Sequence, residues 1–360
     1  MIEVADIFRR YGQEYREKYK DQMLPSHLRA MRDIEDCRTK YMGGHVYICE
    51  NEACEEKKVY AYHSCKNRHC PKCQNDQAEL WLQKQRNRLL PVPYFLVTFT
   101  LPEELRTIVR SNQKALYNIL FQTSAASLQK LALDPRFVGG HIGMIAVLHT
   151  WDRTLGYHPH VHCLVPGGGL SPDHTQWLPS RNDFLVRVEP LSIIFRAKFK
   201  AALKEIGLFD AVADAVWNKD WVVHSEPVGS GKEAMVYLAR YVFRVAISNN
   251  RLVNIDNNRV TFAYQDSETK ERRQMTVAAL EFIRRFLQHV LPKGLIKVRY
   301  YGLLSPAKRN LLAVVMHLLG AHTPAAMPKP AVKAELCCPK CRRPLRFVGR
   351  IDHYERGPPL

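Results

Sequence analysis

Apolar runs and their spacing predict the strands of this chain. Residues 94–102, YFLVTFTLP, are rich in β-branched and aromatic side chains, which is typical of a strand. Apolar runs at 142–151 and 160–166 flank a short polar turn and predict a hairpin. A second hairpin is predicted at 251–266, with an Asp-Asn-Asn turn, and a short strand near 220–228.

Longer stretches of mixed polar and apolar residues predict helices between these strands. They cover 1–36, 77–90, 103–133, 190–206, 231–248 and 276–292. The helix at 77–90 is basic and amphipathic and ends before Pro91. These elements predict an α+β fold, in which an antiparallel sheet is flanked by helices.

Composition shifts along the chain predict its domains. We expect an N-terminal helical segment, a cysteine-rich domain, a basic connecting helix, a large domain of strands and helices, and a basic tail with a Cys-x-x-Cys pair. The predicted bounds are 1–36, 37–75, 76–90, 91–322 and 323–360. Proline-rich sequence at the start of the tail is typical of a linker.

The charge balance indicates a polyanionic partner. The chain has 53 Lys and Arg against 35 Asp and Glu, a net charge of +18, and such an excess favours nucleic acid through counterion release. No apolar run is long enough to span a membrane, and the first residues lack an apolar signal core. We therefore expect a cytoplasmic protein that binds nucleic acid.

Nine of the ten cysteines gather near the two ends of the chain, a distribution that favours metal sites over disulfides. Two knuckles predict one closed structural zinc site, formed by Cys49, Cys54, Cys70 and Cys73. A second zinc site is a weaker hypothesis, formed by Cys37, His45, Cys65 and His69. The pair Cys338-x2-Cys341 cannot fill a tetrahedral site alone, so its role stays open.

Basic side chains interleave with the cysteine ligands in SCKNRHCPKCQ. Lys66, Arg68 and Lys72 are candidate contacts to DNA phosphates on a turn held by metal. A VGSGKE stretch lacks the first glycine of a phosphate-binding loop, so ATP binding is not expected.

The sequence YHPHVHCLVPGGG, at 157–169, predicts a second kind of metal site. Residues i and i+2 of a strand share a face, so His160 and His162 project together. His149, across the predicted hairpin, is the candidate third ligand, with His158 as the alternative. Such a site can hold a divalent cation beside a phosphate, although imidazole alone also suits zinc. The glycines that follow are expected to bring the chain close to bound DNA.

A nucleophile for phosphate chemistry is suggested by the predicted helix at 231–248. Tyr237 and Tyr241 are four residues apart and share a helix face. Arg240 and Arg244 lie near them in sequence as candidate phosphate contacts. Tyrosine can attack a phosphate and keep the bond as a phosphotyrosine. Packing in a core is the alternative role for such a pair.

The combination of these motifs resembles the HUH endonuclease superfamily. The cysteine-rich block, HPHVHCLVPGGGL, YLARYVFRVAISNNRL and LPKGLIKVRYYG together resemble the two-tyrosine transposases of the insertion sequence 91 family, from about residue 5 to 350. The resemblance implies an HUH-type antiparallel sheet with an N-terminal zinc-binding domain. It also implies a rolling-circle transposase acting on single-stranded DNA.

The resemblance further implies roles for individual residues. Tyr237 and Tyr241 would be the nucleophiles that attach to a 5′ phosphate and leave a free 3′ hydroxyl. His160 and His162 would bind Mg²⁺ or Mn²⁺. The chain carries no motor motif, so a host helicase is the candidate for strand displacement. The oligomeric state and the recognised DNA ends stay open.

Three other functions share parts of this pattern. A plasmid replication initiator or relaxase would use the same chemistry. A non-catalytic zinc protein that binds DNA would tolerate phenylalanine at both tyrosines. A zinc-dependent hydrolase would use water as its nucleophile and form no covalent adduct.

Overall fold

The computed structural model divides the chain into two compact units. Its described residues are 2–73, 81, 82, 85, 89–230, 233, 242, 245–266, 268–321 and 336–354. The first unit comprises Met1–Gln77, Ile247–Val290 and Ala325–Leu360, and the second comprises Ala78–Ala246 and Leu291–Pro324. The predicted domain 91–322 therefore contributes residues to both units.

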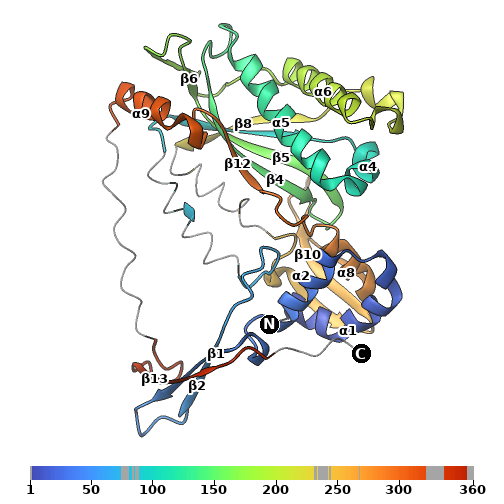
Figure 1. The fold of residues 1–360 in the computed structure, drawn as a ribbon, viewed down its shortest axis with the longest axis vertical. Helices are drawn as coiled ribbons and strands as arrows, with labels where there is room; N and C mark the ends of the chain where they lie inside the picture. The colour runs from blue at the N-terminus through green and yellow to red at the C-terminus, as the bar shows by residue number, and fades with distance from the viewer. Residues whose placement is uncertain are drawn as a thin grey trace. The chain divides into compact units, whose positions relative to one another are not determined.

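The second unit is built on a five-stranded antiparallel sheet with the order β12-β4-β5-β3-β8 (Figure 1). Its strands are β3 (Pro93–Thr100), β4 (Gly143–Trp151), β5 (Tyr157–Pro166), β8 (Val223–Ser230) and β12 (Val298–Gly302). Strands β4 and β5 form the first predicted hairpin. The antiparallel α+β architecture expected from the sequence is confirmed.

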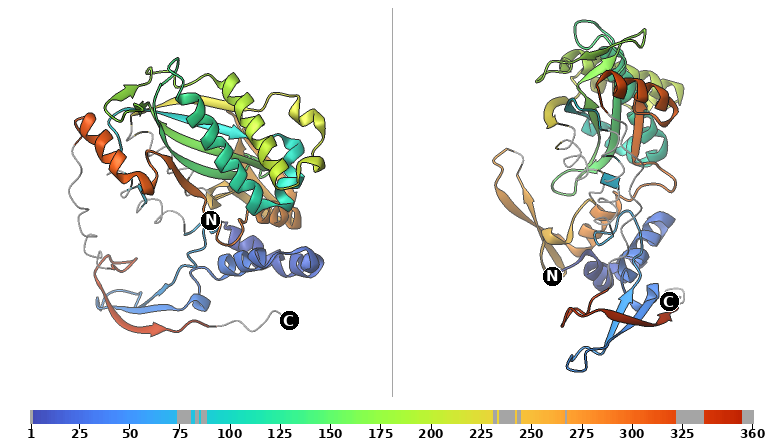
Figure 2. Two further views of the ribbon diagram at one scale, coloured as in Figure 1. Left: turned by 45° about the horizontal axis from the view of Figure 1, so that its top comes forward. Right: turned by 90° about the vertical axis from the view of Figure 1, so that its left-hand side faces the viewer.

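Helices cover one face of this sheet. They are α4 (Arg106–Ser111), α5 (Gln113–Ala132) and α6 (Val188–Glu205), and Figure 2 shows α5 and α6 lying across the strands. Alternate residues of β3, namely Phe95, Val97 and Phe99, are buried in this layer. Each such side chain contributes roughly 1.5–3 kcal/mol on burial. The helices therefore cover one face of each strand, and side chains of the alternate residues point to the other face.

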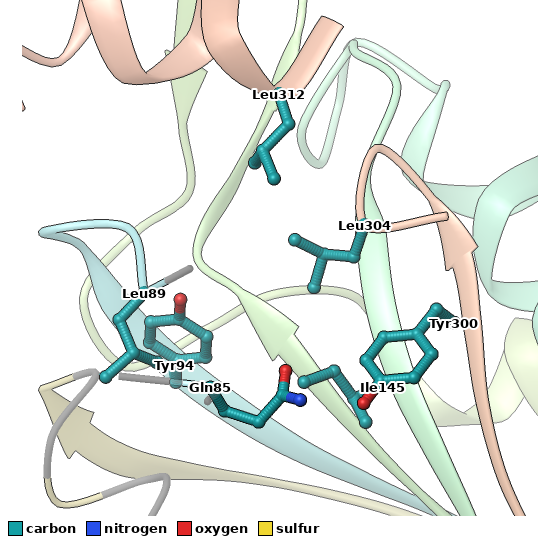
Figure 3. A pocket seen from close by; sticks show the side chains of 7 residues that line it. All are labelled: Gln85, Leu89, Tyr94, Ile145, Tyr300, Leu304 and Leu312. Atoms are coloured by element: carbon teal, nitrogen blue, oxygen red, sulfur yellow. The ribbon is translucent and has the colours of Figure 1, made fainter. Parts of the chain in front are cut away.

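The opposite face of the sheet carries a smaller apolar cluster. Its buried members are Tyr94, Ile145, Val147, Leu164, Val242 and Leu304. Leu312 of α9 (Arg309–Leu318) packs against this cluster. A mostly apolar cavity beside it (Figure 3) has a volume of about 10 Å³, which is room for about one water molecule. It is a packing gap rather than a ligand site.

The glycines after β5 have a role different from the one expected. They lead into a small hairpin of β6 (Gly168–Leu170) and β7 (Trp177–Pro179). At Gly168, with φ +146°, a Cβ would lie 2.7 Å from the carbonyl oxygen of Leu178. At Gly169, a Cβ would lie 2.9 Å from the backbone of Gly140. These glycines allow protein backbones to pack closely and are buried, so they do not form a surface for DNA.

The first unit combines helices with two three-stranded sheets. Its helices are α1 (Val4–Tyr19), α2 (Pro25–Asp36) and α8 (Ala279–Leu287). One sheet has the order β11-β10-β9, with β9 (Leu252–Asp256), β10 (Arg259–Gln265) and β11 (Arg272–Ala278). The other has the order β13-β1-β2, with β1 (Gly44–Cys49), β2 (Lys58–Tyr62) and β13 (Leu345–Ile351). Phe8 of α1 meets Phe286 of α8 edge to face at 5.2 Å.

Several predicted features fall wholly or largely outside the described residues. They are the helices at 77–90 and 231–248 and the proline-rich start of the tail. Within the described ranges, no helix is both long enough and apolar enough to cross a bilayer.

Candidate metal centres

The alternation of strand residues places three histidines on one face of the central sheet. His160 and His162 point away from the helices, because Val161 between them is buried in the helix-covered core. His149 of β4 lies directly opposite His160 of β5 in the register. The sequence pattern His-Val-His on one strand and a histidine on its neighbour therefore builds a cluster.

The three imidazoles lie close enough to share one ion. One nitrogen from each of His149, His160 and His162 lies within 4.8 Å of the others. The ring centroids are 4.8 Å apart for His160 and His162, 4.8 Å for His149 and His162, and 5.4 Å for His149 and His160. His149 and His162 are buried. The partly exposed member of the cluster is therefore His160.

Hydrogen bonds orient two of these rings. His160 Nδ1 lies 2.7 Å from the carbonyl oxygen of His158, and a carbonyl can only accept. The proton therefore sits on His160 Nδ1, which gives Nε2 the lone pair for a metal. His162 Nδ1 lies 2.9 Å from Thr98 Oγ1 on β3, its register partner. Such bonds to the nitrogen away from the metal are typical of histidine ligands.

His158, the alternative third ligand, lies beside the cluster but is not one of its three members. The Arg106 guanidinium donates to His158 Nδ1 at 3.1 Å. Burial, together with the positive charge of Arg106, lowers the pKa of His158. Its backbone carbonyl orients His160, so its contribution to the cluster is to position another ring.

The turn that joins β4 to β5 holds the histidine strands together. Asp152 Oδ1 accepts hydrogen bonds from Thr154 N at 2.8 Å, Thr154 Oγ1 at 2.8 Å and Gly156 N at 2.7 Å. Burial alone would raise the pKa of Asp152, but these hydrogen bonds outweigh it and hold the pKa below the ordinary value. The charged carboxylate is therefore the form that the turn requires.

Replacing Asp152 with alanine is expected to lower the free energy of unfolding by about 1–3 kcal/mol, because the donors lose their acceptor. A carboxylate with a lowered folded-state pKa stabilises the protein at neutral pH, and this contribution is lost as the pH falls below about 4. Urea unfolding at pH 7 and below pH 4 measures both effects. Asp220→Ala is the control, because its side chain is 99% exposed. Equal stabilities of the two variants at pH 7 would contradict the assignment.

Four cysteines of the first unit form a second cluster. They are Cys37, Cys65, Cys70 and Cys73. Cys73 Sγ lies 3.4 Å from Cys37 Sγ and 3.6 Å from Cys65 Sγ. Four sulfurs held about 2.3 Å from one zinc ion lie about 3.8 Å apart, so the cluster fits a tetrahedral zinc site. Hydrogen bonding, chiefly with Cys65, lowers the pKa of Cys37 to about 7, whereas hydrogen bonding with Cys37 raises the pKa of Cys65 and of Cys70.

The structure groups the remaining cysteines differently from the two predicted zinc sets. Cys49 and Cys54 do not meet Cys70 and Cys73; they lie with Cys338 and Cys341 in a separate cluster. His45 and His69 belong to neither cysteine cluster among the described residues. Neither predicted set of four is therefore brought together.

The β1–β2 hairpin explains this regrouping. Cys37 and Cys65 flank the base of the hairpin, where Arg38 N donates to the carbonyl oxygen of His63. Cys49 ends β1 at the opposite tip. Six strand residues span about 17 Å, too far for one ion to bind both ends. Cysteines that are close in sequence are thus separated by an extended element.

The predicted phosphate contacts have different environments. Lys66 is exposed, on a turn with φ +54°. Arg68 is half-buried, and burial lowers its pKa. Lys72 Nζ pairs with Glu3 Oε2 of the N-cap of α1 at 2.5 Å. Tyr237, Tyr241, Arg240 and Arg244 lie outside the described residues. Of the cysteine-block set, Lys66 is thus the most available to DNA.

Comparison with known proteins supports zinc binding by the cysteine block and assigns the histidine-bearing range to a transposase family. Residues 7–101 match a family described as "Transposase zinc-binding domain", and residues 143–311 match a family described as "Putative transposase". The first range contains the cluster at Cys37, Cys65, Cys70 and Cys73, and the second contains His149, His160 and His162. No solved structure matches the chain.

Two curated relatives align with most of the chain. "Putative transposase y4qJ" of Sinorhizobium fredii is 41% identical, over 99% of this chain and 97% of its own. The "Transposase for insertion sequence element IS801" of Pseudomonas savastanoi pv. phaseolicola is 31% identical, over 83% of this chain and 78% of its own. With its zinc-binding domain and the transposase family match, the chain belongs to the insertion sequence 91 family of transposases.

Proposed function

We propose that this transposase cuts and rejoins one strand of DNA by metal-assisted attack of tyrosine on a phosphate. The observation that carries the proposal is the cluster of His149, His160 and His162 on adjacent strands. Three neutral nitrogen donors on one sheet face suit a divalent cation that keeps positions for a phosphate oxygen and water.

Mg²⁺ or Mn²⁺ is the proposed ion at the histidine cluster. When bound, it would polarise the scissile phosphate and stabilise the charge that develops there. His160 and His162 would present Nε2, while His158 and Thr98 hold their Nδ1 atoms. These contacts hold the rings in place before the metal binds, so that metal binding does not have to order them.

Tyr237 and Tyr241 are the proposed nucleophiles. The described residue that follows them, Val242, is buried in the apolar cluster with Val147, and Val147 is the register partner of His162. The Val242 carbonyl oxygen accepts a hydrogen bond from Lys297 Nζ at 3.2 Å. Val242, the residue after Tyr241, therefore lies on the same sheet face as the histidines, and this supports the proposal.

Lys297 links Val242 to the histidines through an aromatic ring. Its Nζ lies 5.0 Å from the centroid of the Trp151 ring, and that ring stacks on His149 at 4.7 Å. A cation over an aromatic face is attracted to it. A continuous set of contacts therefore runs from Val242 through Lys297 and Trp151 to the metal centre.

In the proposed reaction, the tyrosine phenol loses its proton and its oxygen attacks the phosphorus. The bond from phosphorus to the 3′ oxygen breaks, and that oxygen leaves as a 3′ hydroxyl. The 5′ phosphate stays joined to tyrosine, which stores the energy of the broken bond. Attack of a 3′ hydroxyl on the phosphotyrosine then rejoins a strand and releases the enzyme. With two tyrosines, the cycle can be carried out at both ends of an element by rolling-circle transposition.

Single-stranded DNA is the proposed substrate. The chain has 53 basic and 35 acidic residues, and the resulting net positive charge attracts the DNA phosphates. A host helicase is the proposed source of that single strand. Binding to DNA would place the protein at the bacterial nucleoid.

The polarity of the covalent product tests this proposal. A single-stranded oligonucleotide carrying the element's own end is incubated with the protein and Mg²⁺. Label at the oligonucleotide 3′ end should migrate with the protein on a denaturing gel. Label at its 5′ end should appear in a shorter strand that a polymerase can extend. Two free fragments without labelled protein would instead indicate a hydrolase that uses water.

A further inference from the structure

The two ends of the chain meet in the first unit through four cysteines. Cys49 and Cys54 come from the β1–β2 hairpin, and Cys338 and Cys341 come from the C-terminal segment. Cys49 Sγ lies 3.5 Å from Cys341 Sγ, and Cys54 Sγ lies 3.7 Å from Cys338 Sγ. The family match to a zinc-binding domain ends at residue 101 and does not include the second pair.

The sulfur separations fit a metal ion and not disulfides. A disulfide requires about 2.05 Å between sulfurs, whereas sulfurs around one zinc lie about 3.8 Å apart. All four ligand atoms lie within 4.8 Å of one another. Cys49, Cys54 and Cys338 are buried, and Cys341 is partly exposed. The cluster is thus a closed set of four sulfur donors, which is typical of a structural zinc site.

The backbone around the second pair forms a tight turn. Arg342 N donates to the carbonyl oxygen of Cys338 at 2.9 Å, and Cys338 N donates to the carbonyl oxygen of Arg343 at 2.8 Å. Arg342 has φ +62°, a left-handed conformation that residues with a side chain rarely adopt. This turn holds Cys338 and Cys341 close together, with both sulfurs in the cluster.

The C-terminal strand buries little of its own apolar surface, and its Phe347 ring meets the rings of Tyr47 and His45 edge to face. Strand β13 pairs with β1 from Gly44↔Ile351 to Cys49↔Leu345. Phe347 is 49% exposed and Val348 is 40% exposed. Among the residues that the structure describes, the buried cluster next to β13 consists of cysteines, and Leu345 packs against it. Metal binding can supply the folding energy that such a small core lacks.

We propose that Cys49, Cys54, Cys338 and Cys341 bind a second structural zinc ion that fastens β13 to the β1–β2 hairpin. The ion joins ligands that are 284 and 292 residues apart in sequence. The tail that begins after the catalytic unit thereby becomes part of the zinc-binding unit. This inference concerns zinc content and folding and does not depend on the proposed strand cleavage.

Zinc content of the purified full-length chain tests this site. Every protein carries His160→Ala and His162→Ala, so that the histidine cluster contributes no zinc. We expect two zinc ions per chain in this background and one after Cys338→Ser with Cys341→Ser. Cys49→Ser with Cys54→Ser should also leave one. Cys337→Ser, an exposed neighbour outside the cluster, should retain two.

Two further measurements separate loss of the site from general misfolding. Amide hydrogen exchange should become faster at 345–351 in both double cysteine variants, while α5 stays protected. Cobalt substitution should give about half the thiolate-to-metal absorption of the background protein, because two of the eight ligand thiolates are replaced and two more lose their metal ion. Two zinc ions retained after Cys338→Ser with Cys341→Ser would overturn the site. Recovery of the second zinc on mixing the two double variants would overturn its assembly within one chain.

Discussion

Replacing His160 with alanine is expected to reduce metal-dependent cleavage of the element's end by at least about 10³-fold. A metal that polarises a phosphate contributes several kcal/mol to transition-state stabilisation, and each 1.4 kcal/mol corresponds to about tenfold in rate. His160 is one of three nitrogen donors in the cluster. Losing it removes a ligand and exposes the site to water. The initial cleavage rate, measured over a range of Mn²⁺ concentrations, gives the size of the effect.

His141→Ala is the matched control, because His141 belongs to the same unit and is exposed outside the cluster. Its cleavage rate should stay within about twofold of the unmodified protein. Binding of single-stranded DNA should be retained by both variants, since the charge of +18 is spread over many residues. A His160→Ala protein that folds and cleaves within tenfold of the unmodified rate would contradict the role of the histidine cluster.

Local patterns in the sequence predicted most of the central sheet. β3 and the β4–β5 hairpin follow from apolar runs and a polar turn, and their residues alternate between two faces as the period of two requires. The second hairpin also follows from its turn, where Asn257 and Asn258 adopt φ +47° and +57°. Such conformations favour Asn and match the twist of the strands. These features depend on neighbours in sequence, which a sequence displays directly.

Features that depend on distant pairing could not be predicted in this way. The strand β12 is an edge strand beside β4, and β11 occupies residues that include the start of the predicted helix at 276–292. Thr276 and Val277 are β-branched and favour a strand, but the apolar pattern of α8 masks this preference. The pairing of β13 with β1 joins residues about 300 positions apart.

The cysteine sets show the same limit at a site. Spacing indicated zinc knuckles but not which knuckles share an ion, because that depends on where the hairpin places its tip. The sequence predicts that Cys49 and Cys54 share an ion with the nearest knuckle, Cys70 and Cys73, whereas the fold places them beside Cys338 and Cys341. The histidine cluster lies on adjacent strands of one hairpin, so strand alternation alone was sufficient to suggest its members.

Replacing Tyr237 and Tyr241 together with phenylalanine is expected to abolish the covalent protein–DNA adduct. Phenylalanine keeps the ring but lacks the oxygen that attacks phosphorus, so no bond to the 5′ phosphate can form. The metal centre and the zinc sites are unchanged by this substitution. DNA binding and zinc content should therefore stay as in the unmodified protein, and the loss of adduct should exceed about 10³-fold.

The adduct itself is the most direct test of tyrosine chemistry in this transposase. The unmodified protein, Tyr237→Phe, Tyr241→Phe and the double variant are incubated with 3′-labelled single-stranded end DNA and Mg²⁺, then separated on a denaturing gel. We predict labelled protein in the unmodified sample, its loss in the double variant, and a reduced adduct in whichever single variant lacks the tyrosine that attacks first. Labelled protein that persists in the double variant, or cleavage without any adduct in all four proteins, would contradict the tyrosine mechanism.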